Sequence, residues 1–262
     1  MRTSIKYYFI LLVLLPAHAY TQTAAPMATD QHIKLIELRN YLIKPGQRDA
    51  FIRYFADNFI ESQNSRGGYI LGRYRVSEAP DRFFWIRGFR DMASRSQFLN
   101  DFYLGPFWKA HRDYPNSVLL NNDLVYLLKP VDINTGPDDT AFNMNWFRGK
   151  KGMAVVDFYI SNTRRDQLIS FFRTKYRAVL QAAGMDAASY WISETEPNDF
   201  KALPVFQDPN LLVQISFYNN EKEYHSKLKT LEQLSGAELK TEMADLITIR
   251  NTMIIYPTEN EH

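Results

Sequence analysis

The residues best suited to bind a ligand lie at alternate positions of three short stretches in the first half of the chain. Side chains alternate between the two faces of a strand, so residues of one parity share a face. If the aliphatic parity packs under helices, the open face of the sheet collects Glu37, Arg39, Tyr41, Arg73, Trp85 and Arg87. One carboxylate among guanidinium groups and aromatic rings predicts a cradle for a planar anionic ligand. The alternative is an Arg–Glu network that only joins two halves of the protein, where arginine is also common.

A short helix that follows Gly105-Pro106 adds two further candidates, Trp108 and His111, which we expect near the mouth of a cavity. His111 is a weak candidate for a general base or a haem ligand, since histidine supplies both kinds of chemistry. A packing or surface role is the competing interpretation. His225, in a very polar helix, is a still weaker candidate.

Other reaction chemistry has little support in the sequence. Neither histidines nor carboxylates show metal-ligand spacing, and there is no glycine-rich phosphate loop, serine elbow or cysteine. We therefore expect no metal and no cofactor; haem is conceivable but unsupported. In the second half, Asp157 and Arg250 read as a structural ion pair, since a buried carboxylate needs a partner.

The first 19 residues have the features of a secretory signal peptide. Arg2 and Lys6 precede a short apolar run, and Ala17-His18-Ala19 offers a cleavage site. The apolar run is too short to cross a bilayer, so we expect no membrane span after cleavage and an exported protein, periplasmic or extracellular. Without cysteine, such a protein must be held together by core packing, for which 45% hydrophobic residues suffice.

Charge argues against some partners. The 31 basic and 29 acidic residues nearly balance, which does not favour a nucleic-acid or anionic-membrane binder. The first half is rich in arginine and the second is mildly acidic. Docking of the two halves or ordinary solvated surface explains this asymmetry, and a local anion site is the alternative.

The chain repeats one order of elements. Residues 33–130 and 152–257 each read as strand, helix, strand, strand, helix, strand. The predicted fold is α+β: two tandem ferredoxin-like repeats with antiparallel sheets, packed as a pseudo-dimeric α+β barrel that could pair again as a homodimer. The predicted strands are 33–42, 69–76, 82–89 and 118–128, then 153–160, 188–193, 211–217 and 248–256.

The remaining segments are a flexible leader (20–32), a linker (131–151) and a tail (258–262). The linker carries Phe142, Met144, Trp146 and Phe147, which are too apolar for a free tether. In the second repeat, a proline-bearing loop from Glu194 to Asn210 separates the middle strands. Long ordered loops are lids in some proteins and plain insertions in others.

The first repeat resembles a NIPSNAP domain. The resemblance rests on Glu37-Leu38-Arg39-Asn40-Tyr41, Lys44-Pro45-Gly46, Phe51 and Phe55, and then on Trp85, Phe89, Asp91, Arg95, Phe98 and Pro106-Phe107-Trp108. It covers residues 33–130, and residues 152–257 read as a degenerate second copy. The resemblance implies the dimeric α+β barrel superfamily, which includes cofactor-free monooxygenases and haem-dependent chlorite dismutase-like enzymes; NIPSNAP domains themselves have no well-established reaction.

Three functions remain open. The first is a binding protein that holds a small aromatic or anionic molecule in the barrel cavity. The second is an enzyme that uses the same cavity, such as a cofactor-independent monooxygenase, an isomerase or a lyase. The third is a protein-interaction module that uses the aromatic residues of the linker.

Overall fold

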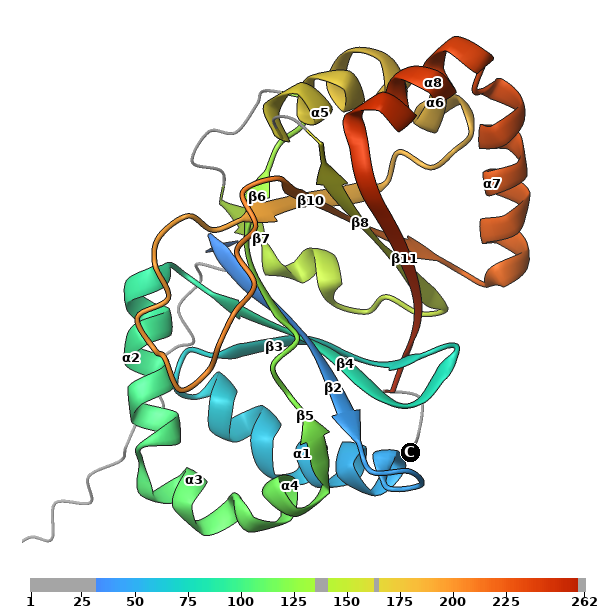
Figure 1. The fold of residues 1–262 in the computed structure, drawn as a ribbon. Helices are drawn as coiled ribbons and strands as arrows, with labels where there is room; N and C mark the ends of the chain where they lie inside the picture. Colours follow the sequence, from blue (N-terminus) through green and yellow to red (C-terminus); the bar gives the residue numbers. More distant parts are fainter. Residues whose placement is uncertain (1–31, 135–140, 163–164, 259–262) are drawn as a thin grey trace, which may run out of the picture. The chain divides into compact units, whose positions relative to one another are not determined.

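Antiparallel strands make up the centre of the protein (Figure 1). The computed structural model describes residues 32–134, 141–162 and 165–258, all within the compact unit Gln31–His262. The predicted signal peptide lies outside the described residues, as do the leader before His32 and the tail after Thr258. None of the helices described is long and apolar enough to cross a membrane.

The first repeat follows the predicted order. Gly46, at φ +75°, makes the turn that ends its first long strand, and Asp91 caps the second helix by accepting a hydrogen bond from the Ser94 backbone at 2.7 Å. Its elements are β1 (His32–Ile33), β2 (Leu35–Ile43), α1 (Arg48–Asn64), β3 (Tyr69–Val76), β4 (Ala79–Phe89), α2 (Met92–Tyr103), α3 (Pro106–His111), α4 (Asp113–Val118), β5 (Leu119–Asn121) and β6 (Val125–Val131).

One predicted strand of this repeat is wrong. Residues 118–128 were expected to be continuous, but Val118 ends α4 and the strand is split into β5 and β6. Between them the Asn121 side chain accepts a hydrogen bond from the Asp123 backbone at 2.9 Å. This local turn of asparagine and aspartate competes with the sheet for the same backbone groups.

The second repeat has the same order and follows a short linker. The linker contains β7 (Phe142–Asn143) and a single helical turn, η1 (Met144–Phe147). The repeat itself comprises β8 (Met153–Ser161), a helix in three parts, α5 (Arg165–Phe171), η2 (Phe172–Tyr176) and α6 (Arg177–Ala182), then β9 (Ala188–Ser193), β10 (Leu211–Tyr218), α7 (Glu221–Leu234), α8 (Ala237–Leu246) and β11 (Ile247–Pro257).

The two repeats close one barrel. Neighbouring strands run in the order β4-β3-β11-β8-β10-β9-β6-β2, and β2 pairs with β4 to complete the ring. The repeats meet at two antiparallel seams, where β3 pairs with β11 and β6 pairs with β9. The fold is therefore the predicted α+β barrel of two ferredoxin-like repeats.

Both faces of the first repeat's sheet are buried, and the prediction of which parity lies under the helices is wrong. Ile36, Leu38 and Ile86 belong to the core inside the barrel, together with Val156 and Val213 of the second repeat. The opposite parity, including Tyr41 and Trp85, packs against α1 and α2. The barrel interior is lined from all sides by strands of apolar residues, so the aliphatic parity fits there and the polar parity meets the helices.

The aromatic residues of the linker close one end of the barrel. Met144 and Phe147 are buried in the barrel core, and the rings of Phe142 and Phe147 lie 4.8 and 6.2 Å from that of Trp191. The expectation that this segment lies against the protein is confirmed. Met144 and Phe147 are therefore part of the core, while Phe142 and Trp146 stay half-buried, and the interaction-module hypothesis stays a prediction.

Candidate functional site

Glu37 is the centre of a buried ionic cluster beneath the helices of the first repeat. Across β2 and β4, Glu37 faces Arg87 and Arg39 faces Trp85. Glu37 Oε2 accepts hydrogen bonds from Arg39 Nη1 at 2.8 Å and from Arg87 Nε and Nη2 at 3.0 and 2.5 Å. Glu37 Oε1 accepts from Nε of Arg95, on α2, at 2.8 Å. The side chains of all four residues have no exposed surface.

The cluster carries more positive than negative charge. Burial alone would raise the pKa of Glu37, but the charges of Arg87, Arg39 and Arg95 outweigh it and hold the pKa well below the usual range. Glu37 is therefore ionised at neutral pH, and one carboxylate faces three permanently charged guanidinium groups. An uncompensated buried charge is costly, so this excess favours a further anion or acceptor nearby.

Three buried donors in this cluster have no acceptor within the described part of the chain. They are Arg39 Nη2, Arg95 Nη2 and the indole Nε1 of Trp85. The guanidinium carbons of Arg39 and Arg87 lie 5.3 and 5.2 Å from the centre of the Trp85 ring, within the range of cation–π attraction. Buried donors are normally satisfied by protein, ordered water or ligand.

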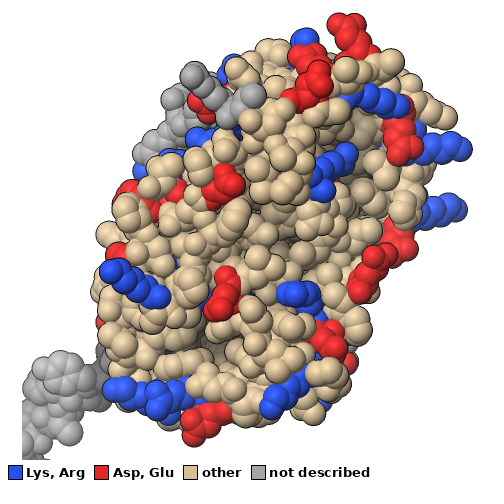
Figure 2. Space-filling model, viewed as in Figure 1, with Lys and Arg blue, Asp and Glu red and all other residues tan. Residues whose placement is uncertain are grey.

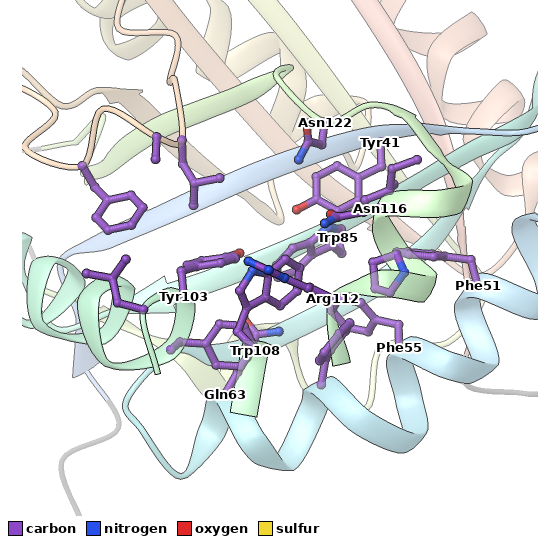
Figure 3. A pocket seen from close by; sticks show the side chains of 18 residues that line it. Tyr41, Phe51, Phe55, Gln63, Trp85, Tyr103, Trp108, Arg112, Asn116 and Asn122 are labelled. Carbon is purple, nitrogen blue, oxygen red and sulfur yellow. The ribbon is translucent and has the colours of Figure 1, made fainter. Parts of the chain in front are cut away.

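A cavity of about 290 Å³ lies beside this cluster, between the outer face of the sheet and the helices (Figure 3). Tyr41 and Trp85 come from the strands, and Phe55 and Gln63 from α1. Trp108 of α3 lies opposite, and its ring is 5.1 Å from that of Tyr103. The walls are mainly aromatic, with Arg112, Asn116 and Asn122 as further polar lining residues.

Two tyrosine hydroxyls connect the arginines with the cavity. Arg39 Nε donates to the hydroxyl oxygen of Tyr41 at 3.0 Å, and Arg87 Nη1 lies 3.5 Å from that of Tyr103 and 2.7 Å from Gln63 Oε1. Burial raises the pKa of Tyr41 to about 12, although Arg39 opposes the shift. Tyr41 therefore keeps its proton, and because its oxygen already accepts from Arg39, the O–H group can donate to a ligand.

The second repeat supplies part of the cavity wall. Its loop 194–210 brings Phe200, Ala202 and Leu203 to the cavity. The same loop contacts the ionic cluster, since Arg95 Nη1 donates to Asn198 Oδ1 at 3.0 Å and lies 3.6 Å from Asp199 Oδ1. The site is thus built by both repeats.

The structure brings together most of the predicted site residues. Glu37, Arg39 and Arg87 form the ionic cluster, and Tyr41, Trp85 and Trp108 line the cavity next to it. Their location differs from the prediction, because they lie between sheet and helices and not inside the barrel. Arg73 pairs with Trp85 across β3 and β4, but its half-buried side chain is not among the partners of Glu37 or the residues that line the cavity.

His111 lies outside this cavity lining. Its ring stacks on that of Phe107 at 4.2 Å, and its Nδ1 lies 2.9 Å from the Phe107 carbonyl oxygen. These contacts fit the packing role. In the second repeat, Arg250 Nη2 lies 3.5 Å from Asp157 Oδ1 as expected, and Thr252 donates to the same oxygen at 2.6 Å.

Sequence reasoning missed three polar residues that the helices place against the strands: Gln63, Arg95 and Tyr103. A signal for the first two existed. Gln63 continues the four-residue spacing of Phe51, Phe55 and Phe59 on one helix face, and Arg95 lies one turn before Phe98. A polar residue at a position of the buried stripe indicates a polar partner beneath the helix.

The described residues offer few ligands for a metal ion or for haem iron. Among the residues described, no group of three His, Cys, Asp or Glu side chains could hold a metal ion. Haem iron takes a His, Cys, Met or Tyr ligand, but the cavity lining contains only tyrosines from this set. Tyr41 and Tyr103 both accept from or face guanidinium groups at their oxygens.

The fold defines this chain as a single-chain α+β barrel of two ferredoxin-like repeats. No protein-family model matches the sequence, and no curated protein matches it significantly. Solved structures match nearly the whole chain. A "putative monooxygenase" from Lactobacillus acidophilus is 13% identical over 86% of this chain and 94% of its own, with a TM-score of 0.53. One from Fusobacterium nucleatum is 7% identical over 86% and 92%, with a TM-score of 0.54.

Two further likenesses bear on the predicted resemblance. An "anthrone oxidase-like protein" is 7% identical over 88% of this chain and 92% of its own, with a TM-score of 0.50. A NIPSNAP domain protein from Burkholderia xenovorans is 18% identical over 37% of this chain and 94% of its own, with a TM-score of 0.35. The NIPSNAP likeness is thus found over part of the chain, and at this TM-score we infer nothing further from it.

Proposed function

We propose that this protein binds a small aromatic acid in the cavity between the first repeat's sheet and its helices. The observation that carries the proposal is the excess of buried guanidinium charge around Glu37, directly behind the polar wall of the cavity. An anionic ligand would offset this charge. Tyr41 and Tyr103 would donate to it, with the charges of Arg39 and Arg87 strengthening both donors.

The remainder of the cavity suits an aromatic ring. Phe55, Trp85 and Trp108 offer faces and edges for stacking. A volume of about 290 Å³ is at the small end of ligand sites, which fits a compact ring system and not a long chain. We propose that the protein does this as an exported, soluble binder, in keeping with the signal-like first 19 residues.

The direct test is isothermal titration calorimetry with benzoate and 1-naphthoate, with benzamide as a neutral comparison. We expect the acids to bind and benzamide to bind at least tenfold more weakly. Tyr41→Phe removes the donor and keeps the ring, so it should weaken the acids selectively. Tyr69→Phe, in a half-buried tyrosine outside the cavity lining, is the matched control. Equal affinity for acid and amide would refute the anion site.

An oxygenase is the second candidate. It is favoured by the whole-chain likeness to structures named as putative monooxygenases and as an anthrone oxidase-like protein. In this reading the same cavity would hold a phenol or anthrone whose ionised form reacts with oxygen, while Tyr41 and Tyr103 stabilise the anion. Oxygen uptake with anthrone, compared with Tyr41→Phe, tests it. Oxygen uptake no faster than without protein would refute the oxygenase function, and the binding function would then be the remaining candidate.

A further inference from the structure

The loop 194–210 is fixed to the first repeat at several points. At its start, the Glu194 backbone donates to the Leu127 carbonyl at 2.9 Å, and near its end Phe206 pairs with β6 through the Val125 and Leu127 backbones. Gln207 Nε2 donates to the Glu194 and Glu196 carbonyl oxygens at 2.9 and 2.7 Å and ties the two arms together. The loop is therefore held in place as part of the site on the first repeat.

Its tip is shaped to meet Arg95. Asn198 Nδ2 donates to the Leu203 carbonyl at 2.9 Å, and Asn198 Oδ1 accepts from both Arg95 Nη1 and the Phe200 backbone, at 3.0 and 3.3 Å. These bonds hold the next residue, Asp199, with its carboxylate 3.6 Å from Arg95 Nη1. The negative charge of Asp199, from the second repeat, thereby lies next to the positively charged cluster of the first repeat.

This placement changes the charge balance of the site. Arg39, Arg87 and Arg95 contribute three positive charges, and Glu37 removes one. Asp199 removes another, although its side chain is 47% exposed and its effect is weakened by solvent. Arg112 of the cavity rim is exposed, so water and salt screen its charge more strongly. One positive charge is left for the ligand to match.

We infer that Asp199 determines the charge class of the ligand and makes the site select aromatic acids with one negative charge over those with two. This rests on the proposed binding function. The first carboxylate, bound by the hydroxyls of Tyr41 and Tyr103, would neutralise the remaining positive charge of the arginines behind them. A second carboxylate would then have no cation left to match and would be repelled by Asp199 and Glu37.

The test compares benzoate with isophthalate, which carry one and two charges at pH 7.5, by calorimetry at fixed ionic strength. Asp199→Asn should improve the affinity for isophthalate relative to benzoate by about twofold to fivefold, the range expected of a half-exposed ion pair. Asn198→Asp adds a charge at the same arginine and should shift the ratio the other way. Glu196→Gln removes an exposed charge from the same loop as the matched control.

The possible outcomes distinguish failure of the Asp199 inference from failure of the proposed binding function. A ratio that Asp199→Asn and Asn198→Asp leave unchanged, while both acids still bind, overturns the role of Asp199 alone. A shift of equal size in Glu196→Gln also overturns it, because the effect would then belong to the loop's overall charge. If neither acid binds the wild-type protein, the proposed binding function itself fails.

Discussion

Glu37 and Arg87 lie directly opposite each other on β2 and β4, and one carboxylate oxygen of Glu37 accepts two hydrogen bonds from the Arg87 guanidinium. Arg39 and Arg95 complete the shell around the same carboxylate. The charges on the face viewed in Figure 2 are dispersed, with both signs side by side. The cluster around Glu37 is by contrast buried, concentrated and unbalanced.

Glu37→Gln should destabilise the protein by about 3–5 kcal/mol, because it leaves three buried guanidinium groups with only the half-exposed Asp199 as counter-charge. Urea denaturation measures the change in the free energy of unfolding. Glu61→Gln, on the exposed side of α1, is the control and should change it by less than about 0.5 kcal/mol. A loss below about 1 kcal/mol for Glu37→Gln would mean that the cluster is already balanced by groups outside it.

The stability should also depend on pH through Glu37. Its pKa is lowered in the folded protein, so its contribution is complete above the unfolded value of about 4.3 and is lost as the pH falls below it. The difference in unfolding free energy between wild type and Glu37→Gln should be constant near neutrality and shrink in acid. A difference that grows as the pH falls would contradict this sign.

Asp157→Asn should behave differently. Burial raises the pKa of Asp157, and Arg250 and Thr252 only partly oppose it, so the ionised form is disfavoured in the folded state. Removing the charge should therefore leave stability at pH 7.5 within about 1 kcal/mol of wild type or raise it, since the amide oxygen can still accept from Thr252. Thermal and urea unfolding would report it. A loss above about 2 kcal/mol would show that the pair with Arg250 is needed.

Phe147→Ala should cost about 3–5 kcal/mol, because it empties space at the end of the barrel where the ring packs near Trp191. Asn145→Ala, an exposed residue of the same turn, is the control. The free energies of unfolding of the two variants, measured by urea denaturation, show whether this segment stabilises the barrel or only connects the repeats. Similar small losses in both would show that residues 142–147 are dispensable for the core.

The sequence predicted which residues share a face but not which side of the sheet that face lies on. Parity grouped Glu37, Arg39 and Trp85 correctly, as their register shows. It could not orient the group, because a closed barrel buries both faces and the aliphatic residues no longer indicate the helix side. The polar residues Gln63 and Arg95 on the helices carried that information.

The contribution of the second repeat to the site could not be predicted from the sequence, for a different reason. The contact between Arg95 and Asn198 joins residues 103 positions apart, and it depends on the seam between β6 and β9. Neither the loop's prolines nor its length indicates where its tip lies. Only the closure of the barrel brings the tip of this loop beside α2.

Anomalous diffraction from crystals soaked in 4-bromobenzoate tests the proposed location of the ligand most directly. We predict a bromine peak in the cavity between Trp85, Trp108 and Phe200, with the carboxylate toward Tyr41 and Tyr103. A second cavity is lined by Asn40, Tyr126 and Met253, among others. A peak there, with the first cavity empty, would contradict the claim.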